Sequence, residues 1–505
     1  MKQNPLCTGF GQFRRGACIL MPVFSLPAQH GIGDFGTSAY AFVDSLHTHG
    51  IKYWQILPLN SGTSQNGESP YFSESAFAIN PLLISLLLLQ GKGLLSAKEI
   101  AALPKFSSDR INYDQVRDAK IPLLRRAVTR FQNTPDFEVF CQRNAFWLDD
   151  FALFESLHTT YARSWDKWPE CARDREPEEI DLCTCTNKLE IHVQKVLQYC
   201  AWTQWDNLHW HCTGKGITVI GDMPIYVARD SSDCWTNASL FKLDAHKRPI
   251  AVSGVPPDYF SATGQLWNNP VYNWDVHERD GFSWWVQRLR HLFSLYDIVR
   301  IDHFRGLVQY WEIPAGETTA VNGAWKKVPT YALFDALMQA IKPFPVICED
   351  LGIITDDVRA AMKHYGFFGM KVLQFAFGDD DPNNPYLPQN FGSDSIVYTG
   401  THDNMPTLGW LRHGVGKREL KRIEDLTGKK SMDGEIVWDL IDIGMQSKAA
   451  IAVVPLQDIL ILDEKARIND PAATQGNWQW RWDPAKNPGE DAFDRFMALA
   501  KTTGR

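Results

Sequence analysis

The chain has 505 residues, of which 44% are hydrophobic and 22% charged, a composition typical of a globular enzyme. The net charge of −8 and the pI near 6.0 argue against nucleic acid and against an anionic membrane surface as partners. The leucine-rich run 82–89 is too short to cross a bilayer, and the first 20 residues lack the features of a signal peptide. Ten cysteines without a secreted disulfide framework favour free thiols in a reducing compartment. The expected location is the cytoplasm, or the plastid stroma if a transit peptide has been removed.

Short apolar runs rich in β-branched residues recur eight times along the chain. They lie at 17–24, 51–59, 217–227, 298–304, 345–351, 368–377, 396–403 and 450–462. Most are continuous rather than alternating, which is typical of strands buried on both faces of a parallel sheet. Helical patterns lie between them, and eight successive βα units predict an α/β protein with one closed (β/α)₈ TIM barrel over residues 1–505. Two open doubly-wound sheets are the alternative, but no G-x-G-x-x-G motif follows any of the runs.

The spacing of the runs predicts large, mostly helical insertions in the βα loops. The stretch 60–215 after the second strand is far longer than one crossover helix requires, and much of it has helical periodicity. We expect a helical subdomain there, forming one wall of the site. A second insertion after the third strand, 228–281, is rich in Gly, Pro, Asn and aromatic residues and is expected to be a long ordered loop with some helix.

Three of the apolar runs end on carboxylates, in the segments IVRIDHFRG (298–306), FPVICEDLG (344–352) and SIVYTGTHDNMPT (395–407). The carboxyl ends of the strands of a (β/α)₈ barrel all point into one site, so these acids are expected to meet in space. Converging carboxyls without metal-type spacing favour glycosyl transfer, which needs one nucleophile and one proton donor. Nineteen tryptophans fit a carbohydrate groove, although most tryptophans in a globular protein pack in the core.

The residues of these segments suggest roles but leave alternatives open. Arg300 and Asp302 are two apart on a strand and face the same side, so the guanidinium is expected to lower the pKa of Asp302 and keep it ionised, as a nucleophile requires. A structural ion pair at the barrel rim is the simpler alternative. Glu349 and Asp350 are neighbours, only one can face the site, and the sequence pattern does not choose between them. Asp403 either binds sugar hydroxyls or caps the next helix.

Longer motifs bear a resemblance to a known family. They are SPYFSESAFAINP (69–81), WLDDFALF (147–154), GDMPIYVARDSSDCW (221–235), GVPPDYFSATGQLWNNPVYNW (254–274), RIDHFRG (300–306), CEDLG (348–352), GTHDN (400–404) and GNWQWR (476–481). Through them the chain resembles the 4-alpha-glucanotransferases of the amylomaltase or disproportionating-enzyme family, within the α-amylase superfamily. The resemblance runs from about residue 17 to residue 482.

The resemblance implies specific site residues. Asp302 would be the nucleophile, Glu349 the general acid/base and Asp403 the residue that holds the ring hydroxyls in the transition state. Further sugar contacts are implied for Tyr71, Asp222, Arg300, His402 and Asn469. The segment 256–267 would be a lid on the acceptor side, with Tyr259, Phe260 and Trp267 as its large rings.

The implied activity moves a segment of an α-1,4-glucan to the 4-hydroxyl of an acceptor sugar, with retention of configuration. The expected partners are malto-oligosaccharides, starch or glycogen-type glucans, and glucose as acceptor, and no cofactor or metal is expected. An α-1,4-glucan hydrolase of the same superfamily is the first alternative, and an inactive glucan-binding protein is the second.

The chain also departs from the family pattern. Relatives usually have Gly in place of Asn268, an aromatic residue in place of Asp470 and Gly in place of Ala472. Many bacterial members also have an aromatic residue near the position of Asn66, belonging to a remote glucan site. These differences concern the lid and the remote site, while the carboxylates of the chemistry are all present.

Overall fold

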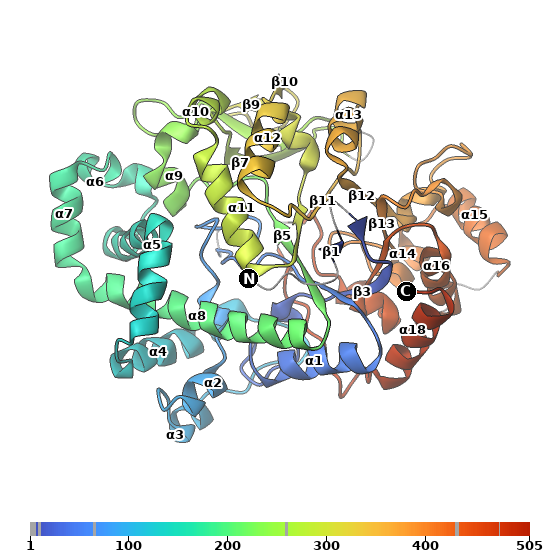
Figure 1. Ribbon diagram of the computed structural model, residues 1–505, viewed down its shortest axis with the longest axis horizontal. Helices are drawn as coiled ribbons and strands as arrows, with labels where there is room; N and C mark the ends of the chain where they lie inside the picture. Colours follow the sequence, from blue (N-terminus) through green and yellow to red (C-terminus); the bar gives the residue numbers. More distant parts are fainter. Residues whose placement is uncertain (1–6, 9–11, 64–66, 258–260, 430–433, 474) are drawn as a thin grey trace.

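The computed structural model describes residues 7–8, 12–63, 67–257, 261–429, 434–473 and 475–505. At its centre is a closed barrel of eight parallel strands (Figure 1). In chain order the strands are β3 (Gly16–Leu20), β4 (Tyr53–Gln55), β5 (Thr218–Met223), β8 (Ile298–Ile301), β11 (Val346–Cys348), β12 (Phe368–Val372), β13 (Ser395–Tyr398) and β14 (Ile451–Pro455). Pairing of β14 with β3 closes the ring. The predicted barrel is confirmed, and the open doubly-wound alternative is excluded.

Each of the eight predicted runs overlaps one barrel strand, and burial of aliphatic side chains explains why. Val299, Ile347 and Val453 are fully buried, one from each of three strands. Side chains from alternate strands fill the barrel interior in layers, so β-branched residues are favoured on both faces. The interior also contains a charged pair, because the register of β5 and β8 places Asp222 directly opposite Arg300.

The segment between β4 and β5 is largely helical. Its helices are α2 (Leu86–Gly91), α3 (Ala97–Ala101), α4 (Tyr113–Arg130), α5 (Pro135–Tyr161), α6 (Glu170–Arg173), α7 (Pro177–Thr186) and α8 (Lys188–Gly214). The two longest, α5 and α8, pack against each other, and α8 then leads into β5 (Figure 1). A side-chain cap from Thr134 and a proline at the first helical position fix the start of α5.

The second insertion differs from its expectation, because it contains strands as well as loop and helix. It comprises α9 (Ser232–Thr236), β6 (Ala251–Val255), β7 (Gln265–Pro270) and α10 (Trp274–Arg279), and the helix α11 (Ser283–Leu295) follows it before β8. Two more strands, β9 (Gln309–Pro314) and β10 (Ala324–Lys327), follow β8, and the four form an antiparallel sheet in the order β10-β9-β6-β7. Val252, Ile313 and Ala320 form a small core of their own on this sheet.

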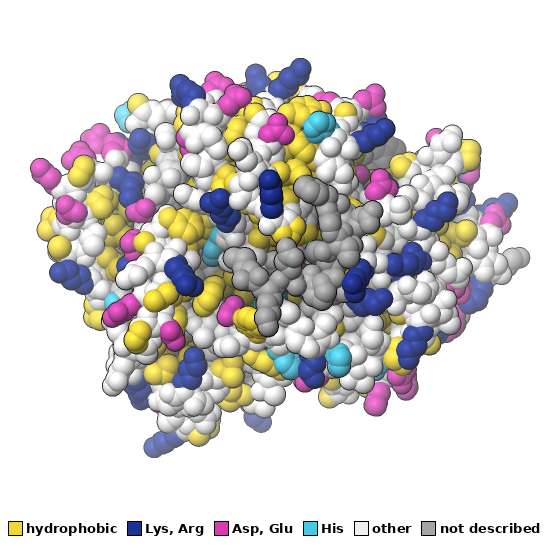
Figure 2. Space-filling model, viewed as in Figure 1, with side chains coloured by type: hydrophobic (Ala, Val, Ile, Leu, Met, Phe, Trp, Pro, Cys, Tyr) yellow, Lys and Arg dark blue, Asp and Glu magenta, His cyan; other side chains and the backbone are white. Residues whose placement is uncertain are grey.

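The remaining helices cover the outside of the barrel. They are α1 (Thr37–Thr48), α12 (Thr330–Ala340), α13 (Asp356–Tyr365), α14 (Thr407–His413), α15 (Lys417–Thr427), α16 (Gly434–Gln446), α17 (Leu456–Ile459) and α18 (Glu490–Thr502). Among the described residues, no helix is long and apolar enough to cross a membrane. Basic and acidic side chains are interspersed over the described part of the face in Figure 2. Nine cysteines between Cys18 and Cys348 are free thiols.

Candidate active site

Four barrel strands bring the charged residues together at their carboxyl ends. Asp222 lies near the end of β5, and Arg300 lies one residue before the end of β8. Asp302 follows β8 directly, and Glu349 follows β11 directly. Asp403 lies in the loop that connects β13 to α14. The common direction of parallel strands thus places acids that are 181 positions apart in sequence at one end of the barrel.

Arg300 is the centre of this arrangement. Its Nη1 donates to both carboxylate oxygens of Asp222, at 2.8 and 2.7 Å, and to Oδ1 of Asp302 at 3.0 Å. The side chains of Arg300 and Asp222 are 3% and 0% exposed, whereas that of Asp302 is 27% exposed. Arg300 and Asp302 therefore do lie on the same side, and Asp222 keeps the guanidinium in place beneath Asp302.

Replacing Asp222 by Asn tests this support. We expect the free energy of unfolding to fall by about 3–5 kcal/mol, because removal of one partner leaves the buried guanidinium short of counter-charge. Chemical denaturation of Asp222→Asn and of the parent protein measures the difference. The exposed pair of Arg495 and Glu435 provides a control, since Glu435→Gln should cost about 1 kcal/mol or less. Equal losses in the two variants would contradict a special role for the buried pair.

The neighbouring acids Glu349 and Asp350 point to different partners. Oε2 of Glu349 accepts the backbone N–H of His303 at 2.8 Å, and Oε1 accepts that of Leu351 at 2.7 Å. Asp350 instead accepts the N–H of Met370 on β12 at 2.6 Å and lies 3.8 Å from the ammonium of Lys371. Glu349 is therefore the one beside the turn that follows Asp302, and Asp350 ties β11 to β12.

The titration of the two acids beside Arg300 differs from the expectation. The pKa of Asp302 is raised to about 8, and burial is the largest cause. The attraction of Arg300 opposes this rise, whereas the nearby carboxyls add to it, namely those of Asp222, Glu349 and Asp403. Burial also raises the pKa of Glu349, against the effects of Arg300 and the two backbone N–H donors. The expectation that Arg300 keeps Asp302 ionised is wrong, because burial and the neighbouring carboxyls outweigh the attraction of one guanidinium.

Asp403 lies at the other side of the site, held by polar neighbours. Its Oδ1 accepts from Nδ2 of Asn469 at 2.6 Å and lies 3.3 Å from Nε2 of His402. The His402 ring stacks on Tyr71 with centroids 5.1 Å apart, and the Tyr71 hydroxyl donates to Oδ2 of Asp222 at 2.7 Å. Burial lowers the pKa of His402, so its imidazole is neutral near neutral pH. These contacts link Asp403 to the Arg300 cluster.

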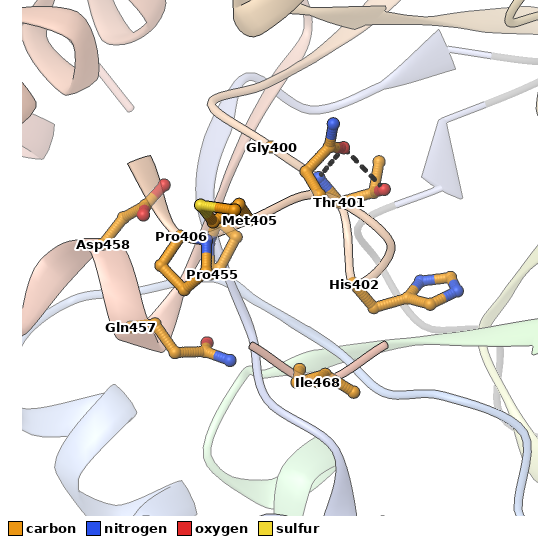
Figure 3. Close-up of a pocket in the computed structure, with 10 residues that line it drawn as sticks. Gly400, Thr401, His402, Met405, Pro406, Pro455, Gln457, Asp458 and Ile468 are labelled. Carbon is orange, nitrogen blue, oxygen red and sulfur yellow. Dashed lines mark hydrogen bonds between the residues drawn. The ribbon is translucent and has the colours of Figure 1, made fainter. Parts of the chain in front are cut away.

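The loop that carries His402 and Asp403 is fixed from behind. Buried Asp458 accepts hydrogen bonds from the hydroxyl of Thr399 at 2.6 Å and from the N–H and hydroxyl of Thr407 at 2.7 and 2.6 Å. Asn404 accepts from the N–H and hydroxyl of Thr401 (dashed lines in Figure 3). The cavity between this loop and Asp458 has a volume of about 10 Å³, room for about one water. His402 points away from Asp458 in Figure 3.

Trp267 lies on β7, next to the turn that follows Asp302. Its ring meets the His303 ring edge to face at 4.9 Å, and its indole N–H donates to the side chain of Gln265. The following residue, Asn268, has a φ of +63°. Asn tolerates this left-handed conformation better than other non-glycine residues, which explains how it replaces the family's glycine. Tyr259, Phe260 and Asn66 lie outside the described residues.

All nine candidate site residues thus lie in one network of contacts, and three further residues join it. His303 has a φ of +48°, which directs its N–H at Glu349. Trp478 packs on Tyr71 and His402, and Arg467 donates to the carbonyl of Asp403 at 2.7 Å. Trp478 and His303 lie in the quoted motifs GNWQWR and RIDHFRG, so the sequence held a signal for both, whereas Arg467 lies in none of the quoted motifs. Among the described residues, no group of three or more His, Cys, Asp or Glu is arranged to hold a metal ion.

Comparison with known proteins identifies one family over most of the chain. A family model described as 4-alpha-glucanotransferase matches residues 21–486. The chain belongs to the 4-alpha-glucanotransferase family. Family members include an enzyme from Thermus thermophilus, 41% identical over 96% of this chain and 98% of its own length. The 4-alpha-glucanotransferase of Streptococcus pneumoniae is 43% identical over 93% of both chains. The chloroplastic/amyloplastic enzyme of Solanum tuberosum is 40% identical over 97% of this chain and 85% of its own.

The three-dimensional comparison agrees. An amylomaltase from Streptococcus agalactiae, solved in complex with acarbose, matches with a TM-score of 0.93 and 34% identity, covering 97% of this chain and all of that one. The amylomaltase of Corynebacterium glutamicum, at 20% identity and a TM-score of 0.79, shares the fold. The predicted resemblance to the amylomaltase family is confirmed, and with it the expected class of enzyme, a transferase acting on α-1,4-glucans.

Proposed function

We propose that this 4-alpha-glucanotransferase cuts an α-1,4 bond in a malto-oligosaccharide or a starch or glycogen-type glucan, and passes the freed segment to the 4-hydroxyl of glucose or another glucan. The observation that carries the mechanism is the pair of carboxyls at the ends of β8 and β11. Both have raised pKa values, and the turn after Asp302 donates its N–H directly to Glu349. We place the reaction in the cytosol, or in the plastid stroma.

In the first step, Asp302 attacks the anomeric carbon while Glu349 gives its proton to the leaving oxygen. Two acids with raised pKa values in one cluster together retain a proton near neutral pH, so one acts as acid and the other as nucleophile. Arg300, 3.0 Å from Asp302, favours the anion there, as does positive charge that develops on the sugar ring. The proton is then on Glu349, and a glycosyl ester forms on Asp302 with inverted configuration.

In the second step, the acceptor reverses the reaction. Its 4-hydroxyl gives a proton to Glu349 and attacks the anomeric carbon, which breaks the ester to Asp302 and restores the α configuration. Asp403, 42% exposed and held by Asn469, is oriented to accept hydrogen bonds from the hydroxyls of the sugar bound beside it. The half-buried Tyr71, whose hydroxyl donates to Asp222, and the neutral His402 complete the part of the site that binds the donor glucan.

Products from pure maltotriose test the transferase reaction against hydrolysis. Transfer yields glucose together with maltopentaose and longer oligomers, and the total of reducing ends stays constant. Hydrolysis yields only shorter sugars, and reducing ends increase. No turnover of either kind, in a correctly folded preparation, would favour the alternative of a glucan-binding protein without activity.

Trp267 is proposed to favour the acceptor sugar over water. A sugar ring stacked on the indole holds the 4-hydroxyl near the anomeric carbon, and the ring next to His303 limits the approach of water. We expect Trp267→Ala to raise the ratio of hydrolysis to transfer by about tenfold, measured as new reducing ends against glucose release from maltotriose. Trp210, which is 62% exposed on α8, serves as control, since Trp210→Ala should leave the ratio unchanged. If both activities of Trp267→Ala fall equally, the residue serves general substrate binding.

A further inference from the structure

We propose that Arg305 is a positioning residue for Glu349, acting through the loop 349–354. The proposal rests on the role of Glu349 as general acid/base stated above. Arg305 lies in the short helix η6 (Phe304–Leu307) and its guanidinium donates to the backbone carbonyl of Ile353. It touches neither of the two carboxyls of the reaction in any hydrogen bond or ion pair of the described residues.

The orientation of the Glu349 carboxyl depends on backbone groups. Its described hydrogen bonds come from the N–H groups of His303 and Leu351, at 2.8 and 2.7 Å. One donor belongs to the turn after Asp302 and the other to the loop 349–354. The carboxyl is therefore oriented only while these two segments keep their relative position, and a shift of about 1 Å in either one misplaces the acid.

Leu351 and Ile354 pack against the core, whereas the tip of the loop between them, Gly352-Ile353, is not anchored by side chains. Ile353 is 64% exposed, so its side chain does not anchor the loop in the core. Gly352 has a φ of +80° and open space where a Cβ would lie, so the turn is not packed there either. Arg305 binds the backbone carbonyl of Ile353, at the tip that the side chains leave without an anchor.

Aromatic contacts hold the Arg305 guanidinium in one orientation toward the loop 349–354. It is 8% exposed, and its guanidinium lies over the Trp325 ring of β10 at 3.9 Å from the ring centroid. Trp325 in turn packs edge to face on Trp311 of β9 at 5.2 Å. A planar cation stacked on an indole keeps one orientation, which an ammonium would not. Because Arg305 is two residues from His303, the segment that supplies one N–H donor of Glu349 also binds the loop that supplies the other.

The test compares two substrates that differ in their need for the acid. Maltotriose has a poor leaving group that Glu349 must protonate, whereas fluoride leaves α-maltosyl fluoride without protonation. We expect Arg305→Ala to lower kcat on maltotriose by about 10- to 100-fold, with KM changed less than about threefold. The initial burst of fluoride should stay within about threefold of the parent, and Arg305→Lys should lie between the two. Arg290→Ala, which removes an exposed arginine bound to the carbonyl of Ala340, is the control and should match the parent on both substrates.

The pH profile gives an independent readout. Loss of the Leu351 N–H donor removes a contact that lowers the pKa of Glu349, so the alkaline limb of kcat should move to higher pH in Arg305→Ala. If Arg305→Ala does not fold, Trp325→Leu keeps the arginine and removes the ring beneath it, and should give the same pattern with a smaller effect.

The outcomes separate this proposal from the one on which it rests. Equal losses on maltotriose and α-maltosyl fluoride, or no loss on maltotriose, would overturn the positioning role of Arg305. Glu349→Gln is measured beside it. If that variant loses activity equally on both substrates, the assignment of Glu349 as the acid fails, whatever Arg305→Ala does.

Discussion

Replacing Asp302 by Asn should abolish turnover and at the same time stabilise the folded protein. Without the nucleophile no glycosyl ester forms, so kcat on maltotriose and the fluoride burst should both fall by a factor on the order of 10⁴ or more. Asn retains an oxygen that can accept from Arg300, so the cluster stays assembled. The Asn side chain does not ionise, so the variant avoids the free-energy cost of ionising a buried carboxyl in the folded protein.

The pH dependence of this stabilisation has a definite sign. The pKa of Asp302 is about 8 in the folded protein, against an ordinary value of 3.8. Between these values the unfolded chain has released the proton and the folded chain keeps it, so the parent loses stability as the pH rises from about 4 to about 8. Asp302→Asn escapes this loss. The free energy of unfolding should exceed that of the parent by a small amount at pH 4 and by about 1–3 kcal/mol at pH 8. This range is reduced from the full effect of the pKa shift because the Asp302 side chain is 27% exposed.

Thermal unfolding at pH 4.5 and pH 8 measures the gain. For a chain of this length it corresponds to an increase in Tm of about 1–3 °C at pH 8. Asp350→Asn is a useful comparison, because burial raises the pKa of Asp350 to about 6 while its oxygen holds Met370. A lower Tm for Asp302→Asn at pH 8 would show that the ion pair with Arg300 outweighs the cost of burial.

Replacing Glu349 by Gln should nearly abolish turnover of ordinary glucans but spare the first step with an activated substrate. We expect kcat on maltotriose to fall by about 10²- to 10⁴-fold, which is the usual contribution of a general acid/base. The fluoride burst from α-maltosyl fluoride should stay within about tenfold of the parent. Gln keeps an oxygen for one of the two backbone N–H donors, so the loop should remain in place.

Asp350→Asn provides the matched control for Glu349→Gln. The two acids are adjacent in sequence, and both accept backbone N–H groups. Because Asp350 faces Met370 and Lys371, its replacement should lower kcat by less than about tenfold. If Asp350→Asn were the more damaging variant, the assignment of roles at the end of β11 would be reversed.

The barrel could be predicted from sequence because its strands are defined locally. Runs such as 298–301 and 395–398 are continuous and β-branched, and each ends where polar residues begin. The position of the carboxylates followed, since parallel strands direct their carboxyl ends to one site. The proximity of Arg300 and Asp302 followed from their spacing of two on a strand.

What the sequence did not show depends on pairs of distant segments. Glu349 and Asp350 could not be distinguished by pattern, because the difference lies in a hydrogen bond to Met370 on another strand. The raised pKa of Asp302 results from burial and from carboxyls on three other strands or loops, none of which its local sequence reveals. The small sheet was missed because β6 and β9 are about 60 residues apart and their pairing has no local signal.

That small sheet limits how the loops above the barrel can be exchanged between relatives. β6 and β7 belong to the connection after β5, β9 and β10 to the connection after β8, and β6 pairs with β9 over four residues. A graft of the first connection alone would leave β9 with an unpaired edge, a site for misassociation with other chains. The connections after β5 and β8 are therefore one structural unit, and both should be exchanged together in a chimera designed to alter acceptor preference.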